Sequence, residues 1–288
     1  MGYDYLDMLM DCEALCNAYP FVEQISIGKS VMGNDLICLK IGTGKKKLFL
    51  NGAHHGMEYL TAAMLVEIAK RYAKAVMKKG FYEGEPAQAL YEKVTLYIAP
   101  MVNPDGVNLA VHGIDACDPF HRRLLEEVGV CSFSDVWQAN IRGVDINHNY
   151  NANWQEVSPK PAPTKYAGPT PESEPETRAV VNFVRTVIPD MLIAFHSQGG
   201  EIYYDFAGLT APRSLELAEK FAKVSGYIAA CPEGSACFGG CKDWFIEEFS
   251  KEGFTVEIGH GTNPLPLELL ATAVRENEPI IACALREI

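Results

Sequence analysis

The sequence predicts a single α/β domain in which a mixed, mostly parallel twisted sheet carries helices on both faces. Strand-like apolar runs alternate along the chain with segments of helical periodicity. The inner strands are continuous apolar runs, as strands that are covered on both faces should be. The 288 residues contain no internal repeat, linker or low-complexity segment, so we expect one domain over residues 1–288.

The first part of the chain is predicted to form two helices and three strands. An amphipathic helix is expected over residues 3–18, and a strand pair over 22–28 and 35–41. The next strand is the buried run Leu48–Leu50. Residues 59–79 carry apolar side chains at helical spacing and should form a long helix.

A second apolar strand is predicted at Val94–Pro100, followed by a turn at Asn103–Gly106. Residues 107–170 show little regular periodicity, and a stretch of that length without its own elements is usually functional. A helix should then run to about residue 187, with Ser173 as its cap. The remaining elements are a strand at Met191–Phe195, helices at 212–226 and 242–250, a strand at Phe254–Ile258, and a C-terminal helix at 266–287 interrupted near Pro279.

Composition excludes several classes of function. The net charge is −12, and the one basic cluster is Lys45-Lys46-Lys47, which argues against nucleic acid or an anionic membrane as a partner. No apolar run is long enough to span a membrane, and the N-terminal segment carries acids where a signal peptide needs basic residues. The nine cysteines match no zinc-finger spacing. We therefore expect free thiols in a reducing cytoplasm, and leave the oligomeric state open.

Ionisable residues follow three of the apolar strands. His55 and Glu58 come after the first, His196 ends another, and Glu257 lies in the last. In open α/β sheets the functional site lies outside the carboxyl ends of the strands, so these residues should converge. Two histidines and a carboxylate, with a fourth position left for water, are typical of catalytic zinc in peptidases. A further glutamate is suited to take a proton from that water and pass it to the leaving amine.

Several segments, in this order, resemble the M14 group of zinc metallocarboxypeptidases over almost the whole chain. They are His55-Gly56-Met57-Glu58 (H-x-x-E), Asn103-Pro104-Asp105-Gly106, Arg142-Gly143-Val144-Asp145-Ile146-Asn147-His148-Asn149, His196-Ser197, Gly239-Gly240-Cys241-Lys242-Asp243-Trp244 and Thr255-Val256-Glu257. The resemblance implies the carboxypeptidase fold and one Zn²⁺ per chain, held by His55, Glu58 and His196. It makes Glu257 the general base and acid. His54, the alternative ligand beside His55, has the wrong spacing to Glu58 for the family motif.

The resemblance also implies roles for residues around the metal. Arg142 would stabilise the oxyanion, and Asp145 would orient a zinc-binding histidine. Asn147 would bind the carboxylate of the substrate. The chain departs from the digestive members at His148, where the family has an arginine, since histidine cannot form the two parallel bonds that arginine makes to a carboxylate. The position of the tyrosine that covers the substrate falls at Ser235.

Lys242 stands where the family sets its side-chain preference, and a lysine there indicates a substrate side chain that ends in a carboxylate. The run from His196 to Tyr204 resembles a bacterial subgroup that cleaves γ-D-glutamyl–diaminopimelate bonds of cell-wall peptides. The substrate would then be a muropeptide. Lys242 would pair with its side-chain carboxylate, Glu201 or Asp205 would meet its amine, and Tyr203 and Tyr204 would wall the pocket.

Two other functions remain open from the sequence. One keeps the chemistry and changes the substrate: a cytosolic carboxypeptidase or deglutamylase that prefers acidic side chains, again because of Lys242. The other is a catalytically silent relative that binds wall peptides, a reading supported by the missing arginine and tyrosine but opposed by Glu257. Cys231, Cys237 and Cys241 are assigned to packing in preference to a metal site or a disulfide.

Overall fold

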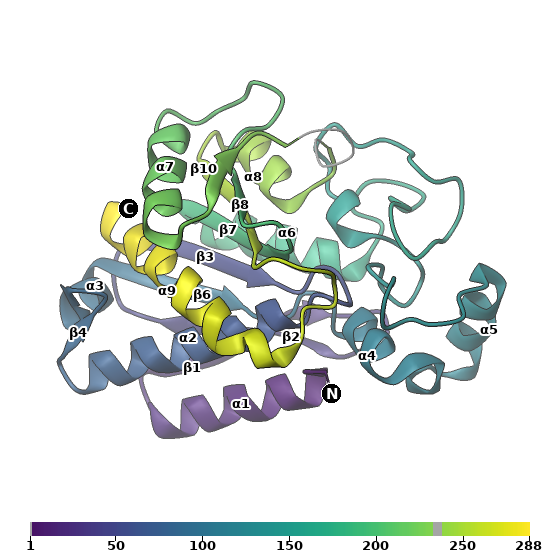
Figure 1. Cartoon of the computed structure of the whole chain (residues 1–288), viewed down its shortest axis with the longest axis horizontal. Helices are drawn as coiled ribbons and strands as arrows, with labels where there is room; N and C mark the ends of the chain where they lie inside the picture. The colour runs from purple at the N-terminus through teal and green to yellow at the C-terminus, as the bar shows by residue number, and fades with distance from the viewer. Residues whose placement is uncertain (1, 233–237) are drawn as a thin grey trace.

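An eight-stranded sheet forms the centre of the computed structural model, which describes residues 2–232 and 238–288 (Figure 1). From one edge to the other the strands are β1 (Val22–Lys29), β2 (Asp35–Ile41), β6 (Val94–Ala99), β3 (Lys46–Gly52), β7 (Met191–Ser197), β10 (Glu252–Ile258), β8 (Glu201–Tyr203) and β9 (Ile228–Ala230). The central strands β6, β3, β7 and β10 run parallel, whereas β1–β2, β2–β6 and β10–β8 are antiparallel pairs.

Helices cover both faces of this sheet. On one face lie α1 (Tyr5–Ala18), α2 (Leu60–Met77), α7 (Ser214–Ser225) and α9 (Leu270–Glu287); on the other lie α6 (Pro175–Val187) and α8 (Cys241–Phe249). The central strands are apolar on both sides because each face has its own core. Leu48 and Leu50 of β3 enter the core beneath α2, and Phe49 enters the one beneath α6. The predicted fold class is therefore confirmed.

Two helices lie where the sequence predicted an irregular stretch. They are α4 (Pro104–His112) and α5 (Pro119–Val128), and the predicted turn at 103–106 is the start of α4. The Asn103 side chain accepts a hydrogen bond from the Gly106 amide, and Pro104 takes the first helical position. Asn-Pro-Asp-Gly serves a helix start as well as a turn, which explains the error. From residue 129 to 174 the described chain is irregular apart from a short 3-10 helix at Ile146–His148.

Two helix boundaries also differ from the prediction. Glu174, not Ser173, precedes the first turn of α6, and the Ser173 hydroxyl donates to the Glu174 carboxylate. Helix α9 starts at Leu270, after a 3-10 turn at Leu267–Leu269, and continues through Pro279. Proline has no amide hydrogen, so the carbonyl of Arg275 receives no helical hydrogen bond from residue 279. The proline is tolerated there because Arg275 is an exposed residue.

Short elements without a periodic pattern escaped the sequence analysis. They are β8, β9, the hairpin of β4 (Phe81–Tyr82) and β5 (Glu85–Pro86), and α3 (Ala87–Lys93). In the part of the chain that the structure describes, no helix is both long and apolar enough to cross a membrane.

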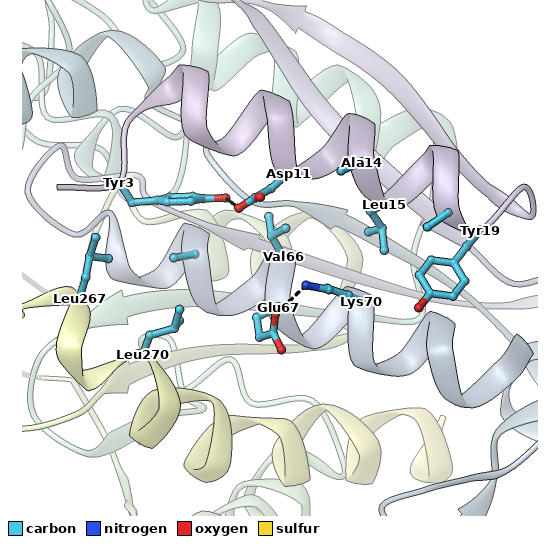
Figure 2. A pocket seen from close by; sticks show the side chains of 12 residues that line it. Tyr3, Asp11, Ala14, Leu15, Tyr19, Val66, Glu67, Lys70, Leu267 and Leu270 are labelled. Atoms are coloured by element: carbon cyan, nitrogen blue, oxygen red, sulfur yellow. Dashed lines mark hydrogen bonds and ion pairs between the residues drawn. The ribbon is translucent and has the colours of Figure 1, made fainter. Parts of the chain in front are cut away.

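A groove lies between α1, α2 and the start of α9 (Figure 2). Apolar side chains form most of its wall, and the Tyr3 hydroxyl donates to Asp11 within it, at 2.9 Å. The lining residues that the structure describes include no predicted site residue, so this groove is separate from the candidate site.

Glu176, in the first turn of α6, is a buried carboxyl whose ionisation should cost stability. Burial, together with the nearby Asp105 and Glu174, raises its pKa to about 7, although the Val31 amide donates to it. When the pKa of a carboxyl is higher in the folded than in the unfolded protein, the folded protein is most stable below the unfolded pKa, here about 4.5. This stability is lost as the pH rises through the folded pKa of about 7. We expect Glu176→Gln to gain on the order of 3 kcal/mol relative to wild type between pH 4.5 and 8.

Urea unfolding of the zinc-free protein at pH 5 and pH 8 checks this expectation. The exposed Glu13→Gln is the matched control and should show no such change with pH. An equal stability difference between Glu176→Gln and wild type at both pH values would contradict a raised pKa.

Candidate metal centre and active site

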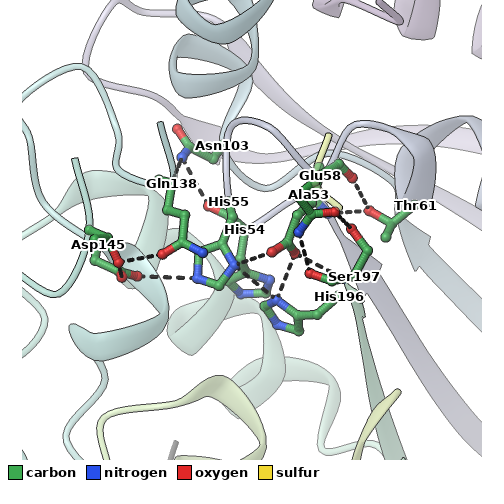
Figure 3. Close-up of polar contacts among 12 residues, drawn as sticks. Ala53, His54, His55, Glu58, Thr61, Asn103, Gln138, Asp145, His196 and Ser197 are labelled. Atoms are coloured by element: carbon green, nitrogen blue, oxygen red, sulfur yellow. Dashed lines mark hydrogen bonds and ion pairs between the residues drawn. The ribbon is translucent and has the colours of Figure 1, made fainter. Parts of the chain in front are cut away.

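Three side chains from two strand ends meet in one buried cluster (Figure 3). The Nδ1 atom of His55 lies 2.8 Å from one carboxylate oxygen of Glu58, and Nδ1 of His196 lies 3.1 Å from the other. The two Nδ1 atoms are 3.3 Å apart. All three side chains therefore direct a donor atom to the same point, and these atoms lie within 4.8 Å of one another.

The loop after β3 is held rigidly, which fixes the direction of His55 and Glu58. The Asn103 amide donates to the carbonyl of His54, at 2.9 Å. A side chain at Gly56 would clash, because its Cβ would lie 2.4 Å from the Gly106 carbonyl oxygen. Local packing of this loop against the start of α4 thus requires a glycine between the two ligand candidates.

Asp145 supports the cluster from the irregular segment. Its Oδ1 lies 3.3 Å from Nε2 of His55, and its Oδ2 lies 3.1 Å from Nδ1 of His148. Burial alone would raise the pKa of Asp145, but the neighbouring His148 and His55 outweigh it and hold the pKa well below its ordinary value. With its Nε2 facing this carboxylate, His55 keeps Nδ1 free for the cluster.

Charge coupling within the cluster is strong. The pKa of Glu58 falls to about 2, because His55 and His196 outweigh the effect of burial. The pKa of His55 rises well above its ordinary value, since Glu58 and Asp145 outweigh its burial. Glu58 is therefore ionised at neutral pH, and its negative charge favours a cation beside it.

Glu257 lies beside the cluster because β7 and β10 pair in parallel with Glu257 opposite His196. Burial, with smaller effects of Glu58 and Glu201, raises its pKa to about 8, against the opposing effect of His55. A carboxyl with a pKa near neutrality can both accept and donate a proton. The structure thus places a group suited to proton transfer next to the cluster.

A small cavity opens beside Glu257. It is lined by Asn147, His148, Tyr203, Phe238, Gly240, Lys242, Asp243, Thr255 and Glu257. Four residues predicted to bind substrate, Asn147, His148, Tyr203 and Lys242, therefore border one space. Their roles stay predictions.

Lys242 is buried at this cavity, and its ammonium group is partly engaged. It donates to the carbonyl of Asp205 and pairs with the Asp243 carboxylate, at 2.5 Å. An ammonium group has three donors, so one is left for a ligand. Asn147 is fixed at the same cavity by the Cys241 amide, which donates to its side-chain oxygen.

Comparison with known proteins identifies the family. Residues 8–277 match the sequence model of a family described as zinc carboxypeptidase. The chain belongs to the zinc carboxypeptidase family. It is 35% identical to "Gamma-D-glutamyl-L-diamino acid endopeptidase 1" of Lysinibacillus sphaericus, over 96% of this chain and 70% of that protein. It is 33% identical to "Uncharacterized protein YqgT" of Bacillus subtilis (strain 168), over 92% and 72%.

Solved structures show the same fold at lower identity. Bovine thrombin-activatable fibrinolysis inhibitor, in complex with tick carboxypeptidase inhibitor, aligns with a TM-score of 0.79 and 21% identity, covering 99% of this chain and 97% of that one. Murein-tripeptide amidase MpaA from Escherichia coli O157 aligns with a TM-score of 0.60 and 21% identity, covering 92% of both chains. At this identity the alignments show the fold alone.

The cluster in this zinc carboxypeptidase fits its metal. Two imidazole nitrogens and a carboxylate are donors that zinc prefers, and Asp145 supplies the usual partner on the far side of a histidine ligand. Bare Nδ1 atoms 3.3 Å apart and directed at one point repel each other unless a proton or a cation lies between them. A zinc ion held by His55, Glu58 and His196 would satisfy all three side chains.

His54 faces away from the donor atoms of this cluster. Its Nε2 lies 2.9 Å from the Tyr150 hydroxyl, and its ring stacks on His196 with centroids 5.4 Å apart. Burial and the neighbouring His196 and His55 lower its pKa well below the ordinary value, so the ring is neutral. His54 therefore packs against His196 and is not one of the three residues that direct a donor atom into the cluster.

Of the two predicted catalytic residues, Glu257 lines the cavity and Arg142 does not. Its guanidinium lies 3.5 Å from the Glu174 carboxylate and is about half exposed. Asn140 also donates to Glu174, at 2.8 Å. No role at the site was predicted for Glu174, because Ser173-Glu174 was assigned to the start of a helix.

Other predicted pocket residues face elsewhere. The Tyr204 hydroxyl lies near the Cys231 thiol, at 3.5 Å, and Asp205 accepts hydrogen bonds from Thr210 and the Gly208 amide. Ser235 and Cys237 lie outside the described residues. The cysteines that the structure describes are free thiols, as predicted.

Proposed function

We propose that this zinc carboxypeptidase hydrolyses γ-D-glutamyl–meso-diaminopimelate bonds in peptides derived from the bacterial cell wall. The observation that carries the proposal is the Lys242 ammonium at the cavity beside Glu257, which pairs with Asp243 and would use its remaining donor for an anionic substrate side chain. The 35% identical relative, whose name describes cleavage next to a diamino acid, supports the same substrate class.

The residues of the site would have the following roles in the reaction. When bound by His55, Glu58 and His196, Zn²⁺ supplies a Lewis acid that polarises the scissile carbonyl and brings the pKa of water to about 7. Glu257 accepts the proton of the attacking water and donates it to the leaving amine of diaminopimelate. Each proton that leaves the water thus reaches the amine, and the carboxylate of Glu257 is regenerated.

Arg142 would stabilise the negative charge that develops on the carbonyl oxygen. Glu174 holds the guanidinium from the side away from solvent, since its own side chain is 3% exposed. Loss of such a donor typically costs about 10²–10³ in rate.

Asn147 and His148 border the cavity where the main-chain carboxylate of diaminopimelate would lie. His148 offers one contact where arginine would offer two, and its Nδ1 lies 3.1 Å from Asp145. The remaining donor of Lys242 would then pair with the carboxylate at the far end of the side chain.

The decisive assay is release of free diaminopimelate from L-Ala-γ-D-Glu-meso-diaminopimelate by the zinc-loaded enzyme. We expect this tripeptide to be cleaved in preference to peptides with ordinary C-terminal residues at equal concentration. An enzyme that leaves the tripeptide intact but releases ordinary C-terminal residues would exclude the proposed specificity.

Lys242 also favours a second candidate, a carboxypeptidase or deglutamylase for acidic C-terminal side chains. On that reading, peptides that end in glutamate replace the tripeptide as the best substrates. Lys242→Ala should then lower activity on C-terminal glutamate far more than on C-terminal leucine.

A further inference from the structure

Strand β8 places a second carboxylate beside Glu257. In the antiparallel pair of β8 and β10, Glu201 lies opposite Glu257, and Tyr203 lies opposite Thr255. Side chains of directly opposed residues share one face of a sheet. Tyr203 and Glu201 also share that face because they are two residues apart. The four side chains therefore form one surface that continues from the cavity.

Glu201 is held in place on this surface. The Tyr203 hydroxyl donates to its Oε2, at 2.6 Å. A Cβ at Gly199 would lie at ordinary contact distance, 3.7 Å, from both Glu201 Oε2 and the Cβ of Glu257, so there is space beside Gly199 that both side chains border. Both carboxylate side chains thus border the same open position.

The charge of Glu201 has no counterpart among the residues that the structure describes. No lysine, arginine or histidine of residues 2–232 and 238–288 pairs with it, and its side chain is only partly exposed. The ammonium group at the cavity is already paired, since Lys242 contacts Asp243. A partly buried carboxylate with one hydroxyl partner is well suited to bind a cation.

Asp205, the other candidate for this role, is engaged in its own turn. Its carboxylate accepts from the Thr210 hydroxyl and from the Gly208 amide, in a segment that is largely exposed. Its main-chain carbonyl accepts a hydrogen bond from Lys242.

We propose that Glu201, oriented by Tyr203, binds the side-chain ammonium group of diaminopimelate. This inference rests on the proposed function. The distal carbon of diaminopimelate carries an ammonium and a carboxylate, so its site needs one anion and one cation. Glu201, which accepts from Tyr203, would supply the anion, and Lys242, which borders the cavity with Tyr203, would supply the cation. A substrate without the ammonium group would leave Glu201 without a cationic partner, whereas one without the carboxylate would leave Lys242 paired with Asp243 alone.

Three tripeptides of the form L-Ala-γ-D-Glu-X separate the two contacts. X is meso-diaminopimelate, 2-aminopimelate (which lacks the distal amine) or L-lysine (which lacks the distal carboxylate). We expect wild type to prefer diaminopimelate over 2-aminopimelate by about 10-fold to 100-fold in kcat/KM, the value of a hydrogen bond to a charged group. Glu201→Gln should abolish this preference by raising KM for diaminopimelate.

Tyr203→Phe and Glu13→Gln complete the comparison. Tyr203→Phe removes the hydroxyl that orients Glu201 and should reduce the same preference by a smaller factor. Glu13→Gln, an equivalent change at an exposed position of α1, should leave all three activities unchanged. Melting temperature and zinc content confirm that each variant is folded and loaded. Calorimetric titration with free meso-diaminopimelate and 2-aminopimelate measures the same preference without turnover.

The ratio between substrates decides the outcome. A Glu201→Gln variant that loses activity equally on diaminopimelate and 2-aminopimelate would overturn the inference, because Glu201 would then act through Glu257. A wild-type enzyme that cleaves both equally would overturn it as well, with the proposed function intact. A wild-type enzyme that cleaves none of the three tripeptides would refute the proposed function itself.

Discussion

Glu257→Gln is expected to lower kcat by about 10³–10⁴, while the protein keeps one zinc ion per chain. General acid–base groups contribute up to about 10⁴ to the rate, and the amide can neither accept nor donate the proton. Glu257 lies outside the group of potential ligands His55, Glu58 and His196, so the substitution should spare metal binding. Single-turnover rates on the tripeptide, together with metal analysis of the same samples, provide the measurement.

The exposed Glu13→Gln is the control for this substitution and should retain full activity and zinc. A Glu257→Gln variant that keeps more than about a tenth of wild-type activity would show that another group moves the proton. If parent and variant are equally inert yet bind wall peptides, the chain is a silent relative that senses these peptides.

Removal of zinc is expected to abolish turnover and to lower the melting temperature by roughly 5–10 °C. A ligand at 100 times its Kd stabilises a protein by about 2.7 kcal/mol, and each kcal/mol shifts the melting temperature of a domain near this size by about 2–4 °C. The physical cause is the cluster itself, where two Nδ1 atoms 3.3 Å apart and the Glu58 carboxylate are buried together. Dialysis against a chelator, then against zinc, should show loss and recovery of both signals.

His196→Ala distinguishes this site from zinc bound elsewhere. The variant should retain less than about a tenth of the zinc, and its melting temperature should no longer respond to added zinc. His112→Ala is the matched control, because His112 is half exposed and pairs with Asp4 at the surface. A zinc ratio near zero in the wild-type protein after loading would contradict a metal centre at this cluster.

Long elements were predictable because their pattern lies within the element. Runs such as Leu48–Leu50 and Met191–Phe195 are apolar on both sides, and this alone places them inside a doubly covered sheet. Strand β8 was not predictable, since three residues carry no periodicity and its place depends on pairing with β10, about fifty residues away. The start of α4 was misread because the Asn103 cap and a turn share the same residue types.

The sequence by itself determined the chemistry of this protein. Parallel strands bring their carboxyl ends to one edge of a sheet, so residues that directly follow those strands come close together at that edge. For this reason His55, Glu58, His196 and Glu257 could be grouped from their positions along the chain. The tertiary structure decided which partners surround them.

Asp145 contacts both His55 and His148, Glu174 holds Arg142, and Glu201 faces Glu257 across a strand pair. These contacts join an irregular segment, a helix start and a short strand. None of them follows a local pattern, because strand order and loop packing set each distance.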